Sequence, residues 1–250
     1  MPTRLIALAL LVLSAPVRAE STNSLTTGFD YSTGKYGGTT STNILYIPVT
    51  GKMQFDNLYL KLTVPYISIS STGDVVRGIG KVKTTTTTRT TTQSGLGDVV
   101  AAAGYTVLEA DALMLDLVGK IKFGTADANK NLGTGENDYS AQMDGYYSMR
   151  NTTLFATAGY TSIGAPAGVS LHNIVYGTVG ISQKAGEKNS FGMIVDAAQA
   201  SSGLNPGTTE LTVFVANKIS PTLKIQAHLL KGFSDSSPDF GGGVMLSGTL

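Results

Sequence analysis

The sequence predicts an all-β protein, a closed, antiparallel, up-and-down transmembrane β-barrel of about 12 strands. Apolar and polar residues alternate with a period of two along most of the chain, and no interval shows helical periodicity. Long and short connections alternate between these segments. Charged residues make up only 14% of the chain, whereas soluble domains carry about 25%. These observations favour a sheet whose apolar face meets lipid.

The clearest hairpin in the sequence spans residues 113–147. In Leu113–Phe123, the odd positions are apolar apart from one glycine, and the even positions include Asp116, Lys120 and Lys122. In Asn137–Tyr147, the polar positions are Asp138, Ser140, Gln142 and Asp144. Both segments therefore predict two-faced strands with one apolar and one charged surface.

The first 19 residues have the pattern of a secretory signal peptide. A basic start, residues 1–4, precedes the apolar run Leu5–Leu13 and a short segment that ends at Ala19. An apolar run of about 9 residues is too short to be a transmembrane anchor. We therefore expect cleavage after Ala19, a single barrel domain over residues 20–250, and localisation in the outer membrane of a Gram-negative bacterium.

The composition bears on partners and on covalent stabilisation. The net charge is +1, and no basic stretch indicates a nucleic-acid partner. Cysteine is absent, so no disulfide holds the fold. The partners expected are outer-membrane lipid and a small-molecule solute, and no cofactor or metal is expected.

The N-terminal half predicts four further segments. Strands are expected at Ser24–Thr33, Asn43–Thr50, Asn57–Tyr66 and Leu96–Leu108. Pro65 lacks a backbone N–H, so the third of these strands is expected to end near it. Ser70–Gly95, with a threonine tract at residues 84–92, predicts an exposed loop or β-ribbon.

The C-terminal half continues the same pattern, with strands expected at Thr152–Thr161, Asn173–Lys184, Ser190–Ala200, Thr208–Ile219, Thr222–Phe233 and Phe240–Leu250. Long connections are expected at residues 34–42, 70–95, 124–136 and 162–171, and short ones at residues 51–54, 109–111, 149–151, 186–189 and 220–221. Outer-membrane barrels place short turns in the periplasm and long loops outside the cell. An open sheet edge would leave backbone groups unsatisfied in lipid, so the first and last strands are expected to pair.

Four glycine-containing motifs, in this order and spacing, resemble a known family. They are Gly95-Leu96-Gly97-Asp98, the stretch Gly119–Thr125, the stretch Gly133–Tyr139 and the stretch Lys231–Asp239. The chain resembles the outer-membrane transporters linked to the MetA pathway of phenol degradation. The resemblance covers most of residues 20–250 and implies a small outer-membrane barrel with a channel role.

The polar faces of the predicted strands supply the candidate lumen residues. They are Lys61, Asp98, Asp116, Lys120, Lys122, Asp138, Gln142, Asp144, Glu210, Lys224, Gln226 and His228. These side chains either form a constriction that sorts solutes or pair with one another to fill a narrow barrel. Lys120 and Lys122 point the same way and repel each other, so both are expected to lie beside carboxylates of the neighbouring strands, such as Asp98 and Asp138.

Three classes of function are open to such a barrel. The first is a channel or transporter for passive uptake of small molecules, hydrophobic or aromatic compounds among them. The second is a barrel with a filled lumen that acts as a surface adhesin or structural protein, in which the threonine-rich loop would bind. The third is a lipid-modifying enzyme, for which only His172 and His228 could supply a catalytic imidazole. The sequence has no Gly-x-Ser-x-Gly motif and no His-x-x-x-His spacing, so the enzyme class is disfavoured.

Overall fold

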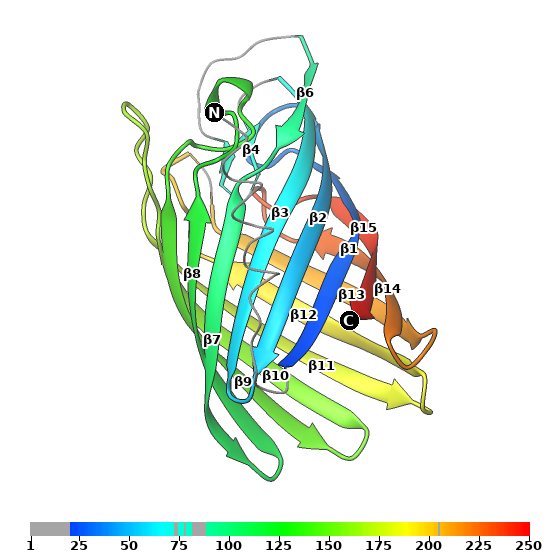
Figure 1. Ribbon diagram of the computed structural model, residues 1–250. Coiled ribbons are helices and arrows are strands. Elements are labelled where there is room, and N and C mark those ends of the chain that lie inside the picture. The colour runs from blue at the N-terminus through cyan, green and yellow to red at the C-terminus, as the bar shows by residue number, and fades with distance from the viewer. Residues whose placement is uncertain (1–20, 73–74, 78, 82–88, 205) are drawn as a thin grey trace.

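The structure is a computed structural model that describes residues 21–72, 75–77, 79–81, 89–204 and 206–250. It is all-β and forms a closed antiparallel barrel, as predicted (Figure 1). The expected signal peptide and residues 82–88 of the threonine-rich segment lie outside the described residues.

Twelve strand positions make up the barrel wall, and one of them is occupied by two consecutive short strands, β6 and β7. The wall strands are β1 Ser21–Gly34, β2 Thr42–Phe55, β3 Leu58–Ser71, β6 Thr91–Leu96, β7 Val99–Ala110, β8 Leu113–Phe123, β9 Asp138–Met149, β10 Thr152–Ser162, β11 Ile174–Ala185, β12 Asn189–Ala198, β13 Thr208–Lys218, β14 Leu223–Gly232 and β15 Phe240–Thr249. A small hairpin, β4 Val75–Val76 and β5 Gly80–Lys81, and the 3-10 helix η1 Ala128–Lys130 lie in the connections.

The ring closes between the first and last strands. β1 pairs with β2 on one side and with β15 on the other, with Phe29 opposite Val244 at this seam. Each of the other wall strands pairs with its neighbours in sequence, so the described strands leave no unpaired sheet edge around the wall. In Figure 1 the short turns gather at the lower end of the barrel and the long connections at the upper end. By the rule for outer-membrane barrels, we refer to these as the periplasmic and extracellular ends.

Three predicted boundaries are wrong. The connection predicted at residues 70–95 ends earlier, because β6 already begins at Thr91 and pairs with β3. β3 does not end near Pro65 but continues to Ser71. Pro65 is tolerated because the neighbouring strand is interrupted opposite it, between β6 and β7. At this break the Gly97 N–H donates to the Pro65 carbonyl. Residues 51–54 are not a turn, because β2 runs on to Phe55 and the chain reverses at Asp56, whose φ is 41°. A glycine at position 51 was thus compatible with a continuous strand.

The two faces of the wall differ in chemistry. Leu117 is 50% exposed on the outside of β8, whereas its neighbour Val118 is 5% exposed on the inside. Large apolar side chains such as Val179 and Leu229 are exposed on the same outer face of other strands. An apolar outer band of this kind is the surface that a barrel presents to lipid. Separately, the described residues include no helix that is long and apolar enough to cross a membrane.

Candidate solute pathway inside the barrel

All twelve sequence-predicted lumen residues lie on the inner face of the wall or at the break in it. On β8 and β9, Asp116 and Asp144 are buried while the adjacent Leu117 and Met143 are exposed outside. Asp98 sits at the break between β6 and β7. The other nine alternate along their strands with outward-facing residues and therefore face the interior. They are Lys61, Lys120, Lys122, Asp138, Gln142, Glu210, Lys224, Gln226 and His228.

A cavity of about 560 Å³ occupies the periplasmic half of the lumen. It is bordered by five of the predicted residues, which are Lys61, Asp116, Lys120, Gln142 and Asp144. Asp56 and Asn57 of the short β2–β3 turn also line it, so the cavity lies at the periplasmic end. Lys224 and Gln226 do not border this cavity. The predicted set is therefore divided between a cavity and other parts of the wall.

Sequence reasoning missed several cavity residues, namely Lys52, Gln54, Tyr59, Glu109 and Tyr146. Lys52 and Gln54 were missed because residues 51–54 were assigned to a turn. The continued alternation after Gly51, with Lys52 and Gln54 polar between Met53 and Phe55, was the signal that could have placed them inside.

The two buried carboxylates of the cavity, Asp116 and Asp144, are held by hydrogen bonds from neutral donors. Asp116 accepts from the Thr106 hydroxyl at 2.7 Å. Asp144 accepts from the Thr157 hydroxyl at 2.6 Å and from the Gln142 amide at 2.7 and 2.8 Å. The carboxylates are thus fixed in the wall of the cavity.

The Gln142 amide links Asp144 to a tyrosine. The Tyr176 hydroxyl donates to the Gln142 carbonyl oxygen at 2.8 Å. Tyr59, on the other side of the cavity, covers the backbone of Gly104, where a Cβ would overlap its ring. Tyrosine rings and hydroxyls therefore line the same space as the charged groups.

The cavity lysines have no carboxylate partner in the described part of the chain. Lys52, Lys61 and Lys120 make none of the ion pairs found there at 4.0 Å or less. The Lys52 ammonium lies 4.5 Å from the Tyr59 ring centroid and that of Lys120 lies 5.1 Å from the Tyr176 ring centroid. The expectation that Lys120 lies beside carboxylates holds only in part: Asp144 borders the same cavity and its charge acts on Lys120, but the group nearest the ammonium is an aromatic face rather than an ion-paired carboxylate.

Lys122, nearer the extracellular end, has the carboxylate partners that the sequence predicted. Its ammonium lies 3.3 Å from Asp98 and 2.9 Å from Asp138. Each carboxylate also accepts a backbone N–H from a long loop, Asp98 from Ala126 and Asp138 from Gly164, both at 2.9 Å. This three-residue cluster therefore ties extracellular loops to the barrel wall.

His228 belongs to a second paired group. Its Nε2 lies 2.8 Å from Asp30 Oδ2, and the two side chains meet across Gly243, which is opposite both in register. A Cβ at Gly243 would approach the His228 ring and overlap the Phe29 carbonyl. Glu210 faces inward opposite Asp196, whose carboxylate accepts from the Thr178 hydroxyl at 2.6 Å. These groups are structural parts of the upper wall.

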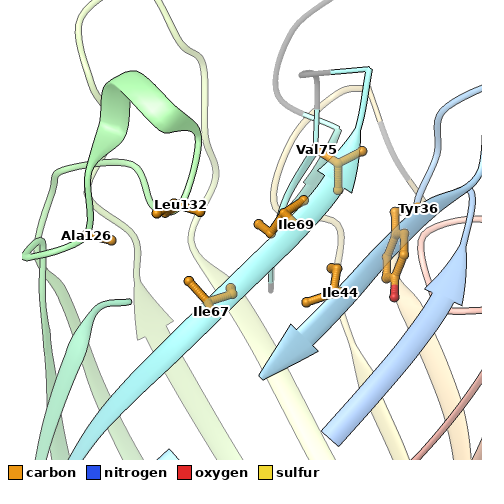
Figure 2. Close-up of a cluster of buried hydrophobic side chains, with 7 residues drawn as sticks. All are labelled: Tyr36, Ile44, Ile67, Ile69, Val75, Ala126 and Leu132. Atoms are coloured by element: carbon orange, nitrogen blue, oxygen red, sulfur yellow. The ribbon is translucent and has the colours of Figure 1, made fainter. Parts of the chain in front are cut away.

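A buried apolar cluster lies at the extracellular end of the barrel (Figure 2). It comprises Tyr36, Ile44, Ile67, Ile69, Val75, Ala126 and Leu132. Figure 2 shows that these side chains come from β2, β3, the β4 segment and two loops. Burial raises the pKa of Tyr36 to about 12, so its hydroxyl stays neutral and donates to Ser32 at 2.7 Å. The cluster is therefore apolar and uncharged.

The start of the threonine-rich connection is buried, although the sequence predicted an exposed segment there. Val75, Val76 and Ile79 are buried, and the Ile79 carbonyl accepts from the Ser201 hydroxyl of another loop at 3.0 Å. Arg77, in the same hairpin, lies 3.7 Å over the ring of Tyr46 on β2. These apolar residues precede the tract and fold inward because the barrel mouth offers an apolar surface to bury them.

The fold defines a class of architecture, the closed 12-stranded antiparallel barrel that solved outer-membrane porins also have. Solved structures similar to the chain include the KdgM porin in complex with disordered oligogalacturonate, with 10% identity, a TM-score of 0.56, and coverage of 91% of this chain and 99% of that one. The NanC porin has 8% identity, a TM-score of 0.59, and coverage of 90% and 99%. At these identities the likeness shows the fold alone. No family model matches the chain, and no curated protein does.

Proposed function

We propose that the protein is an outer-membrane channel for the passive uptake of small molecules. The observation that supports this most directly is the cavity of about 560 Å³ inside a closed barrel, lined by charged and tyrosine side chains. A barrel whose only role was structural would have no need to keep charged groups around such a space. The proposed location is the outer membrane, after cleavage of the signal peptide at Ala19.

The proposed solutes are small compounds with an apolar or aromatic part, as for the family that the sequence motifs resemble. Two features support this. The extracellular mouth is bordered by the apolar cluster of Figure 2, which favours solutes that tolerate an apolar entrance. Tyr59 and Tyr146 then offer ring faces in the cavity below. The twelve candidate lumen residues named from the sequence are proposed as the polar lining of the solute pathway.

One observation favours the second class, a filled barrel that acts as a surface protein. The same apolar cluster buries the loops at the extracellular end, which would suit a plugged barrel that binds partners outside. Conductance decides between these functions. We expect discrete channel openings when the purified, folded protein is added to a planar bilayer.

Two adjacent alanines give a matched pair for this measurement. Ala102 lines the cavity, whereas Ala103 is exposed on the outer face. The variant Ala102→Leu should lower the single-channel conductance because it occupies the pathway, and Ala103→Leu should leave it unchanged because it faces lipid. A folded barrel that is silent in the bilayer, or one in which both variants behave alike, contradicts the channel proposal.

A further inference from the structure

The pairing register gathers three lysines into one row across the inner wall. Lys52 on β2 lies directly opposite Lys61 on β3. Lys61 lies opposite Ala102 on β7, and Ala102 lies opposite Lys120 on β8. Because neighbouring strands are about 4.8 Å apart, the row places three lysines on nearby positions of one side of the cavity wall, with the small side chain of Ala102 between the second and the third.

This row makes no direct ion pair with a carboxylate of the described residues. Like charges directly opposite each other on paired strands repel. Lys122, one inward position beyond Lys120, contacts two carboxylates. The row thus differs from Lys122, for which neighbouring parts of the wall do supply carboxylate partners.

The carboxylates that face the row are already engaged. Asp116 lies four residues before Lys120 on β8 and accepts a hydrogen bond from Thr106. Asp144 lies opposite Asp116 on β9 and accepts hydrogen bonds from Thr157 and Gln142. Asp56 and Glu109 are exposed at the periplasmic rim of the cavity. The remaining titratable groups at the row are the phenols of Tyr59, Tyr146 and Tyr176. No carboxylate of this set is placed within ion-pair distance of the ammonium groups.

We propose that Lys52, Lys61 and Lys120 form a binding site for the carboxylate group of a small organic anion. The anionic oxygens accept hydrogen bonds from the ammonium groups in the gap over Ala102, which removes the repulsion within the row. The carbon skeleton of the ligand lies against the rings of Tyr59 and Tyr176, whose faces already contact Lys52 and Lys120. The site names the solute class of the channel, and for that role it rests on the proposed function.

Equilibrium binding by the full-length barrel in detergent micelles tests the site. The probes are benzoate and benzamide, which have nearly the same shape and differ in charge. We expect benzoate to bind at least about tenfold more tightly than benzamide at low salt, with the difference shrinking as salt screens the lysines. Equal binding of the two probes by the wild-type protein overturns the proposal.

Three substitutions sharpen the test. Lys61→Met and Lys120→Met keep side-chain length but remove the charge, and each should weaken benzoate binding by about tenfold with little effect on benzamide. Lys224→Met is the matched control, because Lys224 faces inward on β14 without bordering the cavity. Heat-modifiable gel migration shows that each variant is folded. Unchanged benzoate binding in both row variants, or an equal loss in Lys224→Met, overturns the site.

This measurement needs no bilayer, so it separates the site from the channel. A protein that prefers benzoate in micelles but is silent in the bilayer retains the site and contradicts the channel. A protein that conducts but binds benzoate and benzamide equally retains the channel and contradicts the site.

Discussion

The two ends of the barrel interior use side chains in opposite ways. At the extracellular end, apolar residues from loops and strands are buried together, and Lys122 is held between Asp98 and Asp138. In the periplasmic half, three lysines that make no ion pair within the described part of the chain line one side of a cavity. The difference indicates a division of roles, in which the upper interior stabilises the closed barrel and its loops, while the lower interior keeps charges free for a ligand.

The largest effect is expected at the apolar cluster. Ile67 is 2% exposed, so Ile67→Ala should lower the free energy of unfolding by about 2 to 4 kcal/mol, through lost burial and the cavity left behind. It should also raise single-channel conductance, because the side chain at the mouth becomes smaller. Urea titration of the barrel in liposomes, with bilayer recording, measures both.

The control for Ile67→Ala is Ile121→Ala on the outer face of β8. Ile121 is exposed there, so lipid can fill the space that the substitution leaves and the loss of stability should be clearly smaller. If both substitutions destabilise the barrel equally, the upper interior does not have the special packing role assigned to it.

An intermediate effect is expected at the upper ion cluster. Lys122→Met leaves Asp98 and Asp138 close together without their shared cation, which should cost about 2 kcal/mol for this partly exposed group. Since both carboxylates also bind loop N–H groups, limited proteolysis should cut residues 124–137 and 163–173 faster. The variant Asp98→Asn combined with Lys122→Met should recover part of the loss, because it removes the repulsion. No recovery, with an unchanged proteolysis pattern, would contradict the role of this cluster.

The sequence could predict the architecture because local rules set it. Alternation with a period of two identified β8 with its observed bounds, Leu113–Phe123, and its two faces. The polar face also led to the carboxylate partners of Lys122, because Asp138 lies directly opposite it on β9 and Asp98 lies just before the start of β7 on the other side. The loop-length pattern gave the closed up-and-down order.

The rest depends on pairing and burial that single segments do not encode. The lysine row was hidden because residues 51–54 were assigned to a turn, so Lys52 was not paired with Lys61. Pro65 was misread because its tolerance depends on a break in another strand, near Gly97. The inward folding of Val75 follows from the apolar surface that Ile67 and Ile69 create at the mouth, which becomes apparent only once distant segments are assembled.

The smallest effect on stability is expected in the lysine row, and it provides the sharpest contrast with Lys122. Lys61 has no ion-pair partner within the described residues and lies opposite Lys52. Lys61→Met should therefore leave stability unchanged or raise it by about 0.2 to 1 kcal/mol, because it relieves a cross-strand repulsion. The wild-type barrel should also gain more stability than the variant when salt is added, since salt screens that repulsion. The same urea titration, run at low and high salt for Lys61→Met and Lys122→Met side by side, measures this contrast. If Lys61→Met destabilises the barrel as much as Lys122→Met does, then the row is part of the structural framework, and the division between the two ends of the interior must be abandoned.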